Sequence, residues 1–155
     1  MIQQKLNTKE RLARLHLIRI SEALCPFCRT DTETTSHLFL HCRLTGRLWY
    51  DICNWMGINW VMPESTYQAF SAWIGMGWKG RKGKIWIAAF FAVVGTIWEF
   101  RNKAVFENAN ICMNWILMLI KTRVALWLKD GQHIGECRVD DIIHQLHCYR
   151  ERCDP

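Results

Sequence analysis

Three cysteines and one histidine lie close together near the N-terminus: Cys25, Cys28, His37 and Cys42. Thiolate sulfur and imidazole nitrogen are ligands that zinc prefers, and structural zinc sites take all four ligands from the protein. Two residues separate the first cysteine pair, and this spacing allows a tight turn, restricted by Pro26, that directs both sulfurs to one point. The sequence therefore predicts one structural zinc ion, with no open position for catalysis.

Two alternatives to this ligand set stay open from the residues alone. The cysteines could be ordinary buried thiols in a cysteine-rich chain. His41 could replace His37 as the fourth ligand, although it adjoins Cys42 and would bind from a strained position. The Cys-x-x-Cys pair followed by a histidine and a cysteine at knuckle-like distance favours the first set.

A second group of sulfur and nitrogen ligands lies near the C-terminus: Cys137, His144, His147, Cys148 and Cys153. Positions 137, 144 and 148 would share one helix face, but the spacing matches no established zinc pattern. We therefore predict a single metal ion. Two other cysteines, Cys53 and Cys112, are expected to be inert core thiols.

Aromatic residues inside the zinc motif are candidates for contact with nucleic acid. Phe27 lies in the first ligand turn and Phe39 follows His37, positions from which knuckles stack rings on unpaired bases. The alternative is that both rings pack the small zinc unit onto Leu24 and Trp49, since such a unit has little hydrophobic area of its own.

Basic residues near the motif are candidates for phosphate contact. Arg29, Arg43 and Arg47 surround it, although they could also form a solvated face because Asp31 and Glu33 lie in the same loop. A glycine-rich segment from 75 to 84 adds four more basic residues: Lys79, Arg81, Lys82 and Lys84. With Trp78 they predict a flexible basic finger for a phosphate backbone or a weak nuclear localisation signal, with a solvated linker as the alternative.

Helices must position these groups, because apolar residues recur at three- and four-residue spacing along most of the chain. Asn7 and Glu10 have the form of a capping box, which predicts a helix over 8–20. A second helix is expected from Ser36 to Gly57, where glycine offers a left-handed end. Further helices are predicted around 67–74 and over 85–106, 111–129 and 140–150.

The tryptophans at helical spacing are expected to form the core: Trp49, Trp55, Trp73, Trp86, Trp98, Trp115 and Trp127. Arg101 and Asn102 are expected at a helix end, where a guanidinium complements the dipole. The predicted fold is mainly α, with a small CCHC zinc-binding unit near the N-terminus packed on a tryptophan-rich helical bundle. We predict a single domain over 1–155, with a zinc-binding unit at 6–57, a helical core at 64–129 and an uncertain C-terminal helix or tail at 130–155.

Composition limits the setting and the class of protein. The net charge of +6 favours anionic partners, and the charged segment from Met1 to Arg19 does not resemble a signal peptide. We expect a nuclear or cytoplasmic protein, in a reducing compartment and not secreted. The apolar run from Ile85 to Trp98 is shorter than the roughly twenty residues that span a bilayer, so we predict a buried helix and no membrane partner.

The zinc motif sits in a longer string that resembles a known family. Residues 24–28, 36–42 and 48–49 resemble the zinc-binding domain that follows the reverse transcriptase in plant LINE-type, non-LTR retrotransposons. Residues 7–12 are similar to the family's preceding segment, and Trp98-Glu99-Phe100-Arg101-Asn102 with Phe106 is similar to its downstream signature. The resemblance covers about residues 6–128 and implies a domain that helps the polymerase engage its RNA template or target DNA.

These observations predict a retrotransposon-derived zinc-binding protein that binds RNA or single-stranded DNA weakly and with little sequence preference. We expect no enzyme activity, because the chain contains no Tyr-x-Asp-Asp polymerase motif and no Gly-x-Ser-x-Gly elbow. The alternative is a zinc-stabilised protein-interaction or regulatory module recruited from a retroelement fragment. A decayed fragment without a selected role is a third possibility.

Overall fold

The computed structural model describes residues 6–76, 80–130, 139–140 and 143–144. Helices make up most of this part of the chain, and no strand forms within it. The elements in order are α1 (Lys9–Arg14), η1 (Ile20–Glu22), η2 (His37–His41), α2 (Arg43–Trp55), α3 (Thr66–Gly75), α4 (Gly80–Phe106) and α5 (Met113–Asp130). The predicted mainly α class is confirmed.

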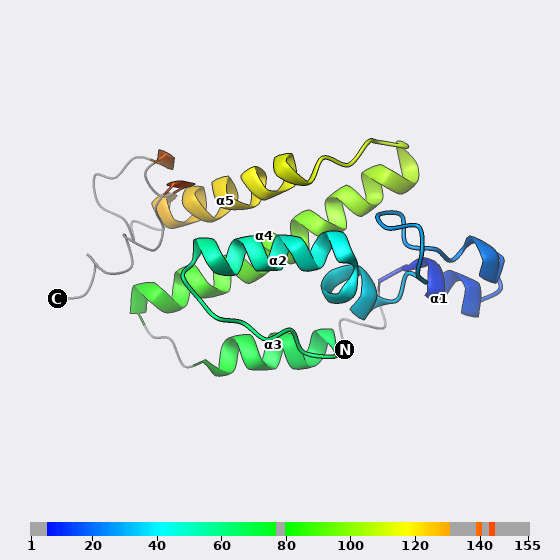
Figure 1. Ribbon diagram of the computed structural model, residues 1–155, viewed down its shortest axis with the longest axis horizontal. Helices are drawn as coiled ribbons and strands as arrows, with labels where there is room; N and C mark the ends of the chain where they lie inside the picture. The colour runs from blue at the N-terminus through cyan, green and yellow to red at the C-terminus, as the bar shows by residue number, and fades with distance from the viewer. Residues whose placement is uncertain (1–5, 77–79, 131–138, 141–142, 145–155) are drawn as a thin grey trace.

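The helices α2 to α5 form a bundle with α4 at its centre. Helix α4 contacts α5 most extensively, and it also contacts α3 and α2. The residues that precede α2 are called the N-terminal unit. Figure 1 shows this unit at the end of the bundle where α2 begins and α4 ends. The zinc motif therefore lies beside the C-terminal half of α4.

Small and β-branched side chains build the contact between α4 and α5. On α5, Ile116, Ile120 and Val124 follow one another at four-residue steps, and all are almost fully buried. On α4, Ala89 and Val93 are also four residues apart and fully buried. Apolar residues at this spacing form one continuous stripe on a helix, so the long helices pack closely along their length.

A pair of stacked tryptophans joins α3 to α4. The ring centroids of Trp73 and Trp86 lie 3.7 Å apart with planes at 11°. The Trp73 indole N–H donates a 2.8 Å hydrogen bond to the Trp86 carbonyl, and the Trp86 indole donates to the Trp73 carbonyl in return. These reciprocal bonds satisfy both buried indoles, which apolar packing alone would leave unpaired.

The predicted tryptophan core is confirmed for most of its members and wrong for two. Trp49, Trp55, Trp73 and Trp86 are buried and Trp98 is partly buried. Trp115 and Trp127 on α5 are 62% and 47% exposed. The face of α5 that meets α4 is formed by its isoleucine and valine stripe, and Trp115 lies one residue, about 100°, away from that stripe.

The first predicted helix is shorter than expected. Helix α1 ends at Arg14, and His16 takes a φ of 56°, which a continuing right-handed helix does not allow. Its cap is Thr8, whose side chain accepts from the Arg11 amide, and not Asn7 as the capping box predicted. The carbonyl of Asn7 instead accepts a bond from Arg101.

The predicted helix from Ser36 to Gly57 is divided in two. Cys42 is extended, with ψ at 131°, so the π-helical turn η2 ends there and α2 begins at the next residue. The expected left-handed end is confirmed, because Gly57 has a φ of 65°. The break at Cys42 allows this residue to act as the N-cap of α2.

The basic glycine-rich segment is partly helical. Helix α4 begins at Gly80, five residues before the predicted start at Ile85, so Arg81 and Lys82 belong to its first turn. Glycine lowers helix propensity by only about 1 kcal/mol, and the packing of α4 can outweigh that cost. Lys79 and Trp78 lie outside the described residues, as do most residues of the predicted helix over 140–150.

Helix α4 is longer than the apolar run in the sequence indicated. Its segment Gly83–Phe106 has the length and apolar composition to cross a membrane. The expectation that this apolar region is too short to span a bilayer is therefore wrong. However, 56% of its most apolar stretch is buried inside the bundle. Contacts with α2, α3 and α5 therefore support the prediction of a core helix.

Candidate metal centre

The four predicted ligands come together in one cluster. One ligand atom from each of Cys25, Cys28, His37 and Cys42 lies within 4.8 Å of the other three. The Cys28 sulfur is 3.3 Å from His37 Nε2, and the sulfurs of Cys25 and Cys42 are 4.0 Å apart. Sulfur ligands of a tetrahedral zinc lie about 3.8 Å from one another, so the cluster has the size and donor set to hold one ion.

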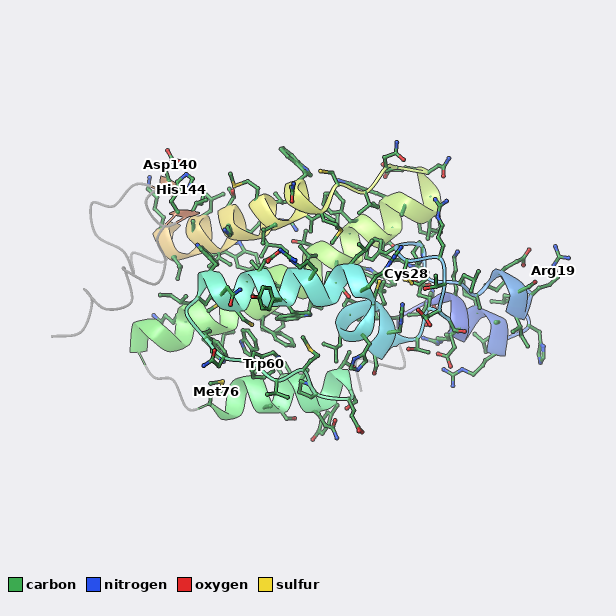
Figure 2. All side chains as sticks on the ribbon, in the orientation of Figure 1. Arg19, Cys28, Trp60, Met76, Asp140 and His144 are labelled. Atoms are coloured by element: carbon green, nitrogen blue, oxygen red, sulfur yellow. The ribbon has the colours of Figure 1, made fainter. Side chains whose placement is uncertain are left out.

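A short antiparallel turn holds the first cysteine pair. The amide of Cys25 donates to the Asp31 carbonyl at 2.7 Å, and the amide of Arg29 donates to the Cys25 carbonyl at 2.9 Å. A bridge between Leu24 and Thr32 closes the loop. Figure 2 shows Cys28 at the junction between this N-terminal unit and the bundle. These backbone bonds bring both cysteines to the same side of the loop.

The other two ligands lie at the two ends of η2. The Cys42 amide donates to the His37 carbonyl at 2.7 Å, so the π-helical turn sets their separation. A hydrogen bond from Cys25 lowers the pKa of the Cys42 thiol, and amides at the start of α2 act in the same direction. The same bond raises the pKa of the Cys25 thiol. Zinc binds cysteine as the thiolate, so a bound ion would displace the thiol protons.

The alternative ligand His41 is excluded by its position. Its side chain is exposed, and its Nε2 atom lies 2.9 Å from the Glu64 carbonyl in the loop before α3. The Nε2 atom of His37 instead faces the Cys28 sulfur, and the His37 amide donates a 2.9 Å hydrogen bond to the Thr34 hydroxyl. The ligand set predicted first is therefore the one that the structure assembles.

Arg29 adopts a backbone conformation that favours glycine, with a φ of 58°. We expect Arg29→Gly to raise the free energy of unfolding by about 1 kcal/mol, because the left-handed strain of a side chain exceeds the entropy that glycine adds to the unfolded chain. Chemical denaturation of the zinc-loaded protein measures this change. Arg29→Lys keeps both the Cβ atom and the charge, so it should leave stability unchanged. A glycine variant less stable than the parent would contradict the assignment.

Both aromatic rings of the zinc motif are buried. Phe27 is 9% exposed and Phe39 is 3% exposed, so neither presents a free face on which a base could stack. The Phe39 ring lies 6.3 Å from the Trp98 ring, and its carbonyl accepts a 2.7 Å bond from the Trp49 indole. The packing alternative is supported, and the prediction of base stacking by these rings is wrong.

The predicted basic contacts fall into two separate regions. Arg29 and Arg43 are exposed near the metal cluster, whereas Arg47 is paired at 3.1 Å with Asp51 on the same helix. The described basic residues of the glycine-rich segment are not brought to this site. Arg81 and Lys82 belong to the start of α4, at the far end of the bundle from the zinc unit (Figure 1).

A buried ion pair, which no sequence pattern predicted, connects the zinc loop to α4. Arg101 donates to the two carboxylate oxygens of Glu33 at 2.6 and 2.8 Å, and both side chains are almost fully buried. Glu33 also accepts from the Lys9 amide at 2.6 Å, at the start of α1. One carboxylate therefore joins the zinc loop, α1 and the central helix.

The stretch Trp98-Glu99-Phe100-Arg101-Asn102 supplies further contacts to this arginine. The Arg101 guanidinium lies 4.9 Å from the Trp98 ring centroid, and its Nη1 atom donates to the Asn102 side chain. Its Nη2 atom, which also bonds Glu33, donates to the Asn7 carbonyl. Arg101 was predicted to bond the carbonyls at the end of its helix. It instead bonds the zinc unit, because Glu33 is buried beside it.

The remaining cysteines differ in accessibility. Cys53 is buried, and burial raises its thiol pKa to about 12, as expected of an inert core thiol. Cys112 is exposed, so the same prediction is wrong for it. Of the C-terminal group of cysteines and histidines, for which no metal was predicted, the structure describes only His144, which is exposed, and the other members lie outside the described residues.

Comparison with known proteins supports the metal assignment. No curated protein and no solved structure matches the chain. Residues 1–49 match the family model described as zinc-binding in reverse transcriptase. The match ends within α2, so the similarity further along the chain stays a prediction. Residues 1–49 are therefore similar to the zinc-binding domain of reverse transcriptases, and Cys25, Cys28, His37 and Cys42 form a cluster able to hold one zinc ion.

Proposed function

We propose that this retroelement-type zinc protein binds RNA or single-stranded DNA weakly and with little sequence preference. The observation that carries the proposal is a groove of about 870 Å³ beside the metal cluster. One wall is the first ligand turn with Arg29, and another is the connection between α4 and α5 with Asn108 and Asn110. Lys9 at the start of α1 also lines it.

The chemistry of this groove suits an unpaired nucleic-acid strand. Lys9 and Arg29 supply positive charge for phosphates, and such contacts read no sequence. The amides of Asn108 and Asn110 can donate to and accept from base edges or ribose hydroxyls. With both motif phenylalanines buried, base stacking on them adds nothing, which is consistent with weak binding.

The zinc is proposed to act through the fold and not through catalysis. Four protein ligands complete a tetrahedral sphere, and the chain contains no Tyr-x-Asp-Asp motif, so we propose no enzyme or polymerase activity. Thiolate ligands also require reduced cysteines. We therefore keep the proposal of a nuclear or cytoplasmic setting.

Binding to a labelled twelve-nucleotide RNA or DNA strand at low salt tests the proposal. We expect affinity to fall as salt rises, and Arg29→Gln to weaken binding about three- to tenfold and to reduce the salt slope by about 0.7. Fluorescence anisotropy of the zinc-loaded protein measures both quantities. Lys129→Gln is the control, because it removes one positive charge at an exposed position near the end of α5 that is outside the groove. No binding by the parent at low salt would end the proposal.

A protein-interaction module is the second candidate function. The observation that favours it is an exposed apolar stripe on α5, formed by Trp115, Met118 and Leu126. These positions lie on one helix face, as anchors of a protein contact often do. Capture of a defined protein at unchanged affinity in high salt, lost in Trp115→Ala, would support this function over nucleic-acid binding.

A further inference from the structure

A second hollow lies on the other side of α1, between that helix, the loop before His37 and the start of α3. Its volume is about 650 Å³, and it is separate from the groove described above. Two arginines, one glutamate and four hydroxyl-bearing residues line it together with a leucine: Glu10, Arg11, Arg14, Leu15, Thr34, Thr35, Ser36 and Ser65. A hollow rich in guanidinium and hydroxyl groups offers donors to an anion.

One donor on a residue that lines this hollow lacks a partner. The Nη1 atom of Arg11 is buried and has no hydrogen-bond partner among the described residues. A buried nitrogen of a charged group that is left unpaired is costly, and native proteins seldom leave one so. Arg14, in contrast, is paired with Glu10 at 3.2 Å. Within the described part of the chain, Arg14 therefore has an ion-pair partner and the Arg11 Nη1 atom has none.

The rest of the hollow is electrostatically suited to a negative group. Ser65, the N-cap of α3, lies at its rim, so the positive end of that ten-residue helix is close by. Ser36 makes no side-chain capping bond to the turn it precedes. The Thr34 hydroxyl, which also lines the hollow, accepts a hydrogen bond from the His37 amide. An anion bound here would adjoin the loop that carries a zinc ligand.

We propose that this hollow is a phosphate-binding pocket, with Arg11 as its anchor, that holds a backbone phosphate of the bound nucleic acid. The proposal rests on the function proposed above for its ligand, but the pocket itself does not depend on the groove. Helix α1 lies between the two, since Lys9 lines the groove and Arg11 lines the pocket. One strand could therefore contact both faces of this short helix.

Inorganic phosphate tests the pocket without nucleic acid. We expect phosphate, at constant ionic strength, to bind the zinc-loaded parent, and Arg11→Gln to weaken it about tenfold. Arg19→Gln carries the same charge change outside the pocket and should bind phosphate as the parent does. Amide chemical shifts of Thr34, Thr35 and Ser36 report binding at the site. Equal weakening in both variants, or no phosphate-dependent shift in the parent, would overturn the pocket.

A variant that binds phosphate more tightly would show that the pocket recognises phosphate, because misfolding could only weaken binding. In Glu10→Gln the acid that lines the pocket is removed and Arg14 is released, so phosphate should bind about threefold more tightly. An unfolded variant could not produce this result. Unchanged or weaker phosphate binding by a folded Glu10→Gln protein would contradict the proposed electrostatics.

The labelled strand identifies the source of the phosphate. If the pocket holds a backbone phosphate, Arg11→Gln should weaken strand binding severalfold and reduce its salt slope by about 0.7. If Arg11→Gln loses inorganic phosphate but binds the strand normally, the assignment to nucleic acid is wrong. A parent that binds phosphate but no strand would overturn the proposed function and leave the pocket's ligand a free phosphate compound.

Discussion

Replacing Cys28 with serine should abolish stoichiometric zinc binding and unfold the N-terminal unit. The Cys28 sulfur lies 3.3 Å from His37 Nε2 inside the ligand cluster, and a neutral hydroxyl there is a poor zinc ligand. Structural zinc contributes about 10–16 kcal/mol to the folding of zinc-finger peptides, which is as large as the stability of a typical domain. The measurements are zinc per chain by metal analysis and amide protection of residues 6–57.

Cys112→Ser is the matched control for this variant. It makes the same chemical change at an exposed cysteine outside the cluster, so zinc content and stability should stay at the parent's values. Removing the metal from the parent with a chelator should reproduce the Cys28→Ser result. A parent protein that purifies folded and without metal would show that the four residues are ordinary thiols and an imidazole.

The consequences of zinc loss should extend into α2. Cys42 is both a ligand and the N-cap of that helix, and the Trp49 indole bonds the Phe39 carbonyl of η2. Losing the metal therefore removes the fixed start of α2 and loosens one buried tryptophan. At the far end of the bundle, where Trp73 and Trp86 stack, we expect the backbone amides to stay protected from exchange longer than those of residues 6–57.

Local features of the sequence were sufficient to predict the metal site. Ligand type and spacing are set by short turns, so Cys25 and Cys28 could be paired without knowledge of the rest of the fold. The end of α2 at Gly57 also depends on one residue's backbone freedom. The break at Cys42 could not be predicted in the same way, because the periodic apolar pattern continues through it.

Features that depend on tertiary packing were outside the reach of the sequence. Helical spacing identifies apolar residues but does not say which stripe meets a neighbour, so Trp115 was placed in the core although it is exposed. Phe39 shows the reverse error, since its place in a knuckle suggested exposure while Trp98 of α4 covers it. The partner of Phe39 lies on a helix far along the chain, whereas Trp115 depends on which face of α5 meets the neighbouring helix α4.

The pair of Glu33 and Arg101 is the clearest such feature, because 68 positions separate the two residues. We expect Glu33→Gln to lower the free energy of unfolding by about 3–5 kcal/mol, since it leaves a buried guanidinium without its counter-charge. Arg101→Met should cost a similar amount by leaving the carboxylate unpaired. Denaturant titration of the zinc-loaded variants measures each change.

The double variant Glu33→Gln, Arg101→Met distinguishes an ion pair from two independent packing residues. If the charges act on each other, the double variant should lose clearly less stability than the two single losses added together. The exposed pair of Arg47 and Asp51 is the control, and breaking it should cost less than about 1 kcal/mol. Additive losses at Glu33 and Arg101 would contradict direct coupling.

Zinc content should stay at one ion per chain in the folded fraction of these variants, because neither residue is a ligand. The ion pair attaches the zinc unit to α4 but does not form part of the metal site.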